Sequence, residues 1–260
     1  MPLGGKSWRE FTPVVGANLG TANVAIFTGQ SNVNNYGVVG LTGLTKPDNA
    51  YAKIWSGTQF IPYTPGGNGN PITGENGMWG QEAEYARRYI ADNAGKTLFI
   101  IKQGYSGMPI SQWDPSTGPY FAAISTEVAQ ARAALFAMGY GSIVTNIVWY
   151  HGESAAIADQ PTADAYQASL AALLPAMRRA WGTSDTKIAM VRIYDANMTY
   201  RSTVRAAQNT VALADPLTYL VNVDDLTLKG GDLYHIDNAS TVTSGSRCYD
   251  AIYSGTTVEA

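Results

Sequence analysis

Val24-Ala-Ile-Phe-Thr28 runs without a break into Gly29-Gln30-Ser31-Asn32, and the fold prediction starts from this stretch. The first five residues are apolar or β-branched, as in a buried strand. A serine in a sharp turn at the end of such a strand has an exposed hydroxyl and a backbone N–H that can face an oxyanion. An ordinary polar turn with a serine cap has the same composition. The stretch therefore predicts a strand that ends in a candidate nucleophile, Ser31, and leaves the polar turn open.

Four further apolar, β-branched runs follow and alternate with segments of helical periodicity. Neither face of these runs shows polar alternation, which is typical of buried parallel strands. We expect strands at Val24–Thr28, Thr97–Lys102, Ile143–Trp149, Lys187–Ile193 and Leu217–Val223, and helices at Gln81–Asn93, Phe121–Met138, Thr162–Trp181 and Arg201–Ala212. Thr162 is the expected N-cap of the third helix, and Pro175 predicts a kink or an early end in it. The alternation predicts a three-layer αβα, flavodoxin-like α/β fold with a five-stranded parallel sheet in the order 2-1-3-4-5.

The segment from Asn34 to Gly80 does not fit this alternation. It is rich in glycine, asparagine, proline and aromatic residues and has little periodicity. It directly follows the first strand, at the carboxyl edge where open α/β sheets place their sites. We therefore expect a long irregular insertion close to the functional site.

The composition limits the classes of protein to which the chain can belong. Of 260 residues, 45% are hydrophobic and 14% are charged, and the net charge is −3. This balance favours one folded domain over residues 1–260 and argues against nucleic-acid binding and against a polybasic membrane surface. No apolar run approaches the roughly 18 residues of a membrane span, and Met1–Gly16 lacks the apolar segment of a signal peptide. We expect a soluble protein whose compartment stays open, with extracellular and virion-associated locations included.

A second candidate site segment, Asp232-Leu-Tyr-His235, lies near the end of the chain. An acid and a histidine three residues apart in one turn can meet, so that the carboxylate orients the imidazole. A solvated loop pair has the same spacing. The order Ser31, Asp232, His235 is one that several hydrolase folds use.

Four blocks of the sequence resemble the SGNH/GDSL hydrolase superfamily. More narrowly, they resemble its sialate O-acetylesterase and acetylxylan esterase branch, carbohydrate esterase family 6. The four blocks, in chain order, are Gly29–Asn32, Ser106-Gly-Met-Pro-Ile-Ser-Gln-Trp113, Trp149-Tyr-His-Gly-Glu153 and Asp232–His235. Gly80-Gln-Glu82 is similar to a further element of the family. Two positions depart from the pattern, with Ser106 in place of a glycine and His151 in place of a glutamine.

The resemblance implies a serine esterase that removes O-acetyl groups from a carbohydrate through an acyl-enzyme intermediate. Ser31 is then the nucleophile, His235 the general base and Asp232 the residue that orients the imidazole. The backbone N–H groups of Ser31 and Gly107 are the expected oxyanion donors. The expected partner is an acetylated carbohydrate or another small ester. No cofactor or metal is implied, since two histidines and one cysteine form no recognisable ligand set.

Several roles stay open. His151 has one N–H in its neutral form and is a candidate third oxyanion donor, or the base in place of His235. Glu153 either serves as a second acid for His235 or braces the nucleophile turn, in which Gln30 and Asn32 are the supporting residues. The aromatic residues of the insertion and of the second block either stack on sugar rings or form a small core of their own. Of these aromatic residues, Trp113 is the preferred substrate contact.

Two other functions compete with the deacetylase. One is an esterase of the same fold that acts on lipid, aryl or thioester substrates, because the pockets lie in loops that the fold does not determine. The other is a non-catalytic glycan-binding or virion structural module. The sequence predicts no oligomeric state.

Overall fold

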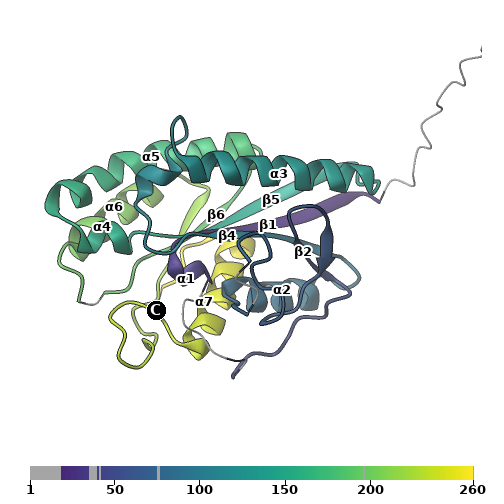
Figure 1. Cartoon of the computed structure of the whole chain (residues 1–260), viewed down its shortest axis with the longest axis horizontal. Helices are drawn as coiled ribbons and strands as arrows, with labels where there is room; N and C mark the ends of the chain where they lie inside the picture. The colour runs from purple at the N-terminus through teal and green to yellow at the C-terminus, as the bar shows by residue number, and fades with distance from the viewer. Residues whose placement is uncertain (1–18, 35–39, 41, 75–76, 196, 260) are drawn as a thin grey trace, which may run out of the picture.

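A seven-stranded sheet forms the centre of the computed structural model, which describes residues 19–34, 40, 42–74, 77–195 and 197–259 (Figure 1). The strand order is β3-β2-β4-β1-β5-β6-β7. The strands are β1 (Thr21–Gly29), β2 (Ala52–Trp55), β3 (Phe60–Pro62), β4 (Leu98–Gly104), β5 (Ser142–Tyr150), β6 (Ile188–Val191) and β7 (Thr218–Val221). All neighbours pair in parallel except β2 and β3, which are antiparallel.

The five strands expected from the sequence are present as β4-β1-β5-β6-β7, in the expected order. The expected number of five strands is wrong, because two short strands from the insertion extend the sheet beyond β4. β2 pairs with β4 in parallel, and β3 turns back along β2. With four and three residues, these strands are too short to show a periodicity in the sequence.

Helices cover both faces of the sheet (Figure 1). They are α1 (Ser31–Asn34), α2 (Gln81–Asp92), α3 (Pro119–Ala137), α4 (Glu153–Ile157), α5 (Gln160–Trp181), α6 (Arg201–Leu213) and α7 (Asn238–Asp250), with a 3₁₀ turn at Ile110–Trp113 and a π turn at Ala251–Gly255. Successive strand residues point to opposite faces. Ile26 accordingly joins the core beneath α3, α5 and α6, and Phe27 joins the core beneath α2 and α7. Within the described ranges, no helix has the length and apolar character needed to cross a membrane.

The helix ends differ from the sequence expectation in two places. The N-cap of α5 is Asp159, whose carboxylate accepts the N–H of Thr162, so Thr162 is not the cap. The helix also continues through Pro175 to Trp181, and the early end was a wrong prediction. Helix α7 was not expected from the sequence, because its serines and threonines have low helix propensity. Its N-cap, Asp237, accepts the N–H of Ser240.

A buried ion pair fastens α2 to the sheet. The Nζ atom of Lys102 on β4 lies 2.8 Å from Oε1 of Glu82, and both side chains are 0% exposed. The same oxygen accepts the hydroxyl of Tyr63 and the N–H of Gly80, each at 2.8 Å. Charge in the interior is tolerated only with such partners. This pair therefore holds the insertion, α2 and β4 together behind the nucleophile turn.

We expect Glu82→Gln to lower the free energy of unfolding by about 3–5 kcal/mol, because it leaves the Lys102 ammonium buried without its carboxylate partner. Asp195→Asn is the matched control, since it removes an ion pair to Arg201 in which the side chains are 39% and 54% exposed. The control is expected to cost at most about 1 kcal/mol. Urea unfolding of the three proteins measures both values. Equal losses in the two variants would contradict a structural role for the buried pair.

Candidate active site

The turn that carries Ser31 is formed by a close approach of two strands. At the end of β1, Gly29 has φ +141°, and a Cβ atom there would lie 2.0 Å from the carbonyl oxygen of Tyr150 on β5. Only glycine fits this position. The next residue, Gln30, donates its N–H to the same carbonyl at 2.8 Å. The chain therefore leaves the sheet sharply, and Ser31 begins α1 at the carboxyl edge of the sheet.

The structure brings Ser31 together with the Asp232–His235 segment. Nε2 of His235 lies 2.7 Å from Oγ of Ser31, although the two residues are 204 positions apart in the sequence. Nδ1 of His235 lies 2.7 Å from Oδ2 of Asp232. Burial raises the pKa of Asp232, but hydrogen bonds from the N–H groups of Tyr234 and His235 and from the His235 ring outweigh it and lower the pKa to about 2. The carboxylate is therefore ionised where it faces the imidazole.

Asn32 and Glu153 brace the histidine from the side. The Asn32 amide nitrogen donates to Oε1 of Glu153 at 2.7 Å and to the carbonyl of Tyr234 at 3.1 Å. Its oxygen accepts the N–H of Ile236 at 3.3 Å. Asn32 thus holds the backbone on both sides of His235, and Glu153 holds Asn32. Burial raises the pKa of Glu153, while its hydrogen bond from Asn32 opposes the rise. This geometry favours bracing by Glu153, since the carboxylate bonded to His235 is that of Asp232.

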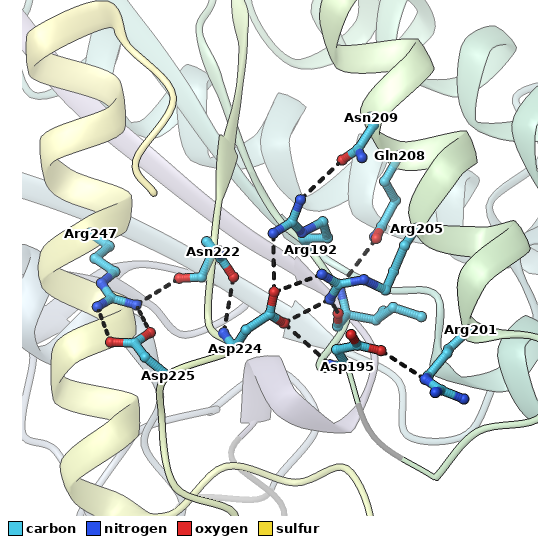
Figure 2. Close-up of polar contacts among 11 residues, drawn as sticks. Arg192, Asp195, Arg201, Arg205, Gln208, Asn209, Asn222, Asp224, Asp225 and Arg247 are labelled. Atoms are coloured by element: carbon cyan, nitrogen blue, oxygen red, sulfur yellow. Dashed lines mark hydrogen bonds and ion pairs between the residues drawn. The ribbon is translucent and has the colours of Figure 1, made fainter. Parts of the chain in front are cut away.

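Arginines anchor the start of the segment that carries the histidine (Figure 2). Asp224, just after β7, accepts hydrogen bonds from Arg205 at 2.6 and 2.7 Å and from Arg192 at 3.1 Å. Its neighbour Asp225 pairs with Arg247 of α7 at 2.6 and 2.7 Å. Burial raises the pKa of Asp224, but the two arginines hold it below its ordinary value. The segment is thereby tied to α6 and α7 before it reaches the pocket.

Gln30 joins the nucleophile turn to the loop after β4. Its amide nitrogen donates to the carbonyl of Met108 at 2.9 Å, and its oxygen accepts the N–H of Gly152 at 2.9 Å. Gly107, in the same loop, has φ +71° and open space where a Cβ would lie. Within the described part of the chain, the backbone N–H groups of Ser31 and Gly107 donate no hydrogen bond. Both are therefore available to a ligand.

His151 does not lie where the sequence placed it. The side chain is fully buried, with Nε2 3.1 Å from the Met108 carbonyl and Nδ1 3.3 Å from the Tyr166 hydroxyl. A carbonyl only accepts, so the neutral ring carries its proton on Nε2 and donates it to Met108. Burial lowers the pKa of His151 to about 3. The predicted third oxyanion N–H is thus engaged elsewhere, and the histidine bonded to Ser31 is His235 and not His151.

Trp113 is likewise displaced from its expected role. Its exposed fraction is 0%, and its ring packs edge-on against Trp149 and His151 at centroid distances of 5.6 and 5.0 Å. A buried ring offers no face to a sugar, so the predicted substrate contact is wrong. Trp55 and Trp79 from the insertion are also buried. The alternative, a small core of their own, is not observed either: Trp55 and Trp113 join the core beneath α3, α5 and α6, and Trp79 joins the core beneath α2 and α7.

A pocket of about 260 Å³ opens beside Ser31 and His235. Its lining residues are Gln30, Ser31, Ser106, Gly107, Glu153, Ser154, Ile157, Tyr234 and His235. Three of these residues, Ser154, Ile157 and Tyr234, had no predicted role, although Ser154 and Tyr234 adjoin predicted residues. No group of three or more histidine, cysteine, aspartate or glutamate side chains in the described ranges is arranged to hold a metal.

Solved structures with the same fold come from several organisms. A protein from Arabidopsis thaliana has a TM-score of 0.72 at 19% identity, covering 89% of this chain and 98% of that one. A carbohydrate acetylesterase from Xanthomonas citri has a TM-score of 0.58 at 16% identity, and the alignment covers 90% of this chain and 57% of that one. A variant of an acetyl xylan esterase from Geobacillus stearothermophilus has a TM-score of 0.51 at 13% identity, and the alignment covers 93% of this chain and 99% of that one. At these identities the likeness establishes the fold.

The family assignment rests on sequence. No curated protein matches the chain. A sequence model of the family described as "carbohydrate esterase, sialic acid-specific acetylesterase" matches residues 21–254, from the start of β1 to the turn after α7. The match includes Ser31, Asp232 and His235. This chain therefore belongs to the sialic acid-specific acetylesterase family of carbohydrate esterases and is a carboxylic ester hydrolase.

Proposed function

We propose that this protein removes O-acetyl groups from a carbohydrate through an acyl-enzyme intermediate on Ser31. The observation that carries the proposal is the hydrogen-bonded line from Ser31 through His235 to Asp232, with both distances 2.7 Å and with Ser31 and His235 on the wall of the pocket. Family membership supplies the substrate class. The carbohydrate esters named for the Xanthomonas and Geobacillus proteins are consistent with it.

In the first step, Oγ of Ser31 attacks the acetyl carbonyl carbon while Nε2 of His235 accepts the hydroxyl proton. The ionised Asp232 stabilises the imidazolium that forms. The negative charge on the carbonyl oxygen meets the backbone N–H groups of Ser31 and Gly107. When the carbon–oxygen bond to the sugar breaks, His235 gives its proton to the leaving alcohol. Water then enters, and the same histidine activates it to release acetate.

The surroundings of the pocket bear on the alcohol part of the substrate. Ile157 lines the pocket, and Met108 and Leu233 adjoin the lining residues Gly107 and Tyr234 in the sequence; these three apolar side chains are 48%, 37% and 53% exposed. Their apolar surfaces suit the C–H face of a sugar ring. They equally suit a short ester of a non-sugar alcohol, which is the second candidate function.

We expect wild-type protein to hydrolyse para-nitrophenyl acetate and acetylated sugars, and Ser31→Ala to lose on the order of 10⁴-fold or more in kcat. Acetate should be preferred to butyrate by at least about tenfold, because each added methylene must fit a small acyl site. Steady-state kinetics on an ester series measures both. Glycan binding by a wild-type protein that hydrolyses no acetate would support a binding module instead, and equal rates along the series would favour the non-sugar esterase.

Asp232 and Glu153 are expected to differ strongly in their effects on kcat. Asp232→Asn removes the charge that faces Nδ1 of His235 and should lower kcat by about 10³–10⁴-fold. Glu153→Gln keeps an oxygen to accept the Asn32 amide and should cost about tenfold or less. The two variants carry the same carboxylate-to-amide change, so each is the control for the other. A larger loss in Glu153→Gln would make Glu153 the acid partner of His235.

We assign His151 to positioning the Met108 loop, and its buried neutral ring predicts how stability depends on pH. Its pKa is lowered from 6.5 to about 3, so the unfolded chain binds the proton more readily than the folded one. This ring therefore makes the folded state lose stability as the pH falls from about 6.5 towards 3. The loss is about 2 kcal/mol between pH 7 and pH 5.

Urea unfolding of wild type and His151→Gln at pH 7, 6 and 5 tests this assignment. The stability difference between the two proteins should shift by that amount in favour of the variant as the pH falls. The variant should also keep the wild-type dependence of kcat on pH at the acid end of the range. If the unfolding free energies of the two proteins changed equally with pH, His151 would not have a lowered pKa. If the variant lost the dependence of kcat on pH at the acid end, His151 would be the general base in place of His235.

A further inference from the structure

The site described above has two donors for the developing oxyanion, both from the backbone. The polar side chains that surround them are already engaged. His151 donates its N–H to the Met108 carbonyl, and the Gln30 amide nitrogen donates to the same oxygen. The Asn32 amide nitrogen donates to Glu153 and to the Tyr234 carbonyl. The ring N–H of His151 and both amide N–H groups of Asn32 are therefore not left to face an acyl oxygen, and Gln30 uses one of its two amide N–H groups on the Met108 carbonyl.

Ser106 differs from these side chains. It lines the pocket with Ser31 and Gly107, and its Oγ atom is buried. Among the residues that the structure describes, this Oγ has no hydrogen-bond partner. Leaving a buried hydroxyl unsatisfied costs about 1–3 kcal/mol, so a hydroxyl of this kind in the pocket wall is a candidate donor to a ligand.

The other hydroxyl groups of the pocket do not share this property. Ser31 is bonded to His235 at 2.7 Å, and Ser154 donates to the Met108 carbonyl at 3.1 Å. The Tyr234 hydroxyl is not among the buried atoms that lack a partner. Within the described part of the pocket wall, Ser106 therefore carries the one buried hydroxyl that is not satisfied.

The place of Ser106 in the chain fits an oxyanion donor. The N–H of Gly107 belongs to the peptide that joins Ser106 to Gly107. The side chain of Ser106 and this N–H are therefore attached to neighbouring backbone atoms of the loop. Serine has three staggered χ1 positions, and its hydroxyl proton rotates freely about the Cβ–Oγ bond. For the hydroxyl to act beside this N–H, χ1 must turn Oγ from its buried position into the pocket that Ser106 and Gly107 both line.

We infer that the Ser106 hydroxyl is the third oxyanion donor and a catalytic residue of this chain. The inference rests on the proposed acyl-enzyme mechanism. The proton stays on Oγ throughout, and the hydroxyl donates to the acyl oxygen as that oxygen gains negative charge. Such a donor acts mainly on the transition state, because the hydrogen bond strengthens as the charge develops.

Steady-state kinetics of Ser106→Ala on para-nitrophenyl acetate tests the inference. We expect kcat to fall by about 10²-fold with KM changed by less than about threefold, as for the loss of one oxyanion donor. Ser106→Thr keeps a hydroxyl and should retain most of the activity. Ser111→Ala is the matched control, because it removes an exposed serine hydroxyl from the turn that follows the same loop.

Two further readouts separate a donor from a merely structural serine. The rate at which a para-nitrophenyl phosphonate inactivates the enzyme through Ser31 should fall with kcat in Ser106→Ala, since the phosphoryl oxygen occupies the oxyanion position. The thermal unfolding midpoint of this variant should not fall, because the hydroxyl that it removes bonds to no described residue.

Two results would overturn the role of Ser106 alone. One is a kcat for Ser106→Ala within about threefold of wild type, and the other is a loss confined to KM, in both cases with Ser31→Ala inactive. If Ser31→Ala instead kept wild-type activity, or wild type hydrolysed no acetate ester, the acyl-enzyme proposal itself would fail and this inference with it. The Ser31 variant therefore distinguishes the two failures.

Discussion

The approach of β1 to β5 at Gly29 is the constraint on which the rest of the active edge depends. A side chain at this position would lie 2.0 Å from the Tyr150 carbonyl oxygen. Because the position is glycine, the chain can bend away from the sheet at once and bring Ser31 to the carboxyl edge. Tyr150 ends the strand that leads directly into His151 and Glu153. One backbone contact therefore sets the spacing between the nucleophile turn and the segment that braces it.

The residues on either side of Ser31 carry this placement outward. Gln30 bonds to the loop after β4 and to the backbone after β5, and Asn32 bonds to Glu153 and to the backbone around His235. The nucleophile turn is thus linked to three other segments by two neutral amide side chains. An amide suits this task because it donates and accepts in one plane and needs no compensating charge. The proposed base and the proposed oxyanion donors are therefore both positioned relative to the backbone at Ser31.

The sequence predicted what depends on local pattern and missed what depends on packing. The alternation of apolar runs and helices predicted the five central strands and their order, and the resemblance of four sequence blocks to a known family predicted that Ser31 meets Asp232 and His235. The strands β2 and β3 are too short to show a periodic pattern of apolar residues in the sequence. The misplacement of His151 and Trp113 has another cause, because residue type indicates neither burial nor which carbonyl a ring nitrogen meets. Tertiary contacts between segments distant in the chain decide both.

The two departures from the family blocks have a common physical explanation in the Met108 loop. At position 151 a histidine stands in place of the family's glutamine. Its ring N–H donates to the Met108 carbonyl, which also accepts a hydrogen bond from Gln30. The loop that presents Gly107 is therefore held in place, and the ring N–H of His151 is not left for an acyl oxygen. At position 106 a serine replaces a residue with no side chain, and its hydroxyl has no other described partner. The ring serves to position the loop and the serine supplies the donor, so the two substitutions are expected to depend on each other. If they do, the effects of changing positions 106 and 151 will not be additive, because each residue acts on the same loop and the same oxyanion.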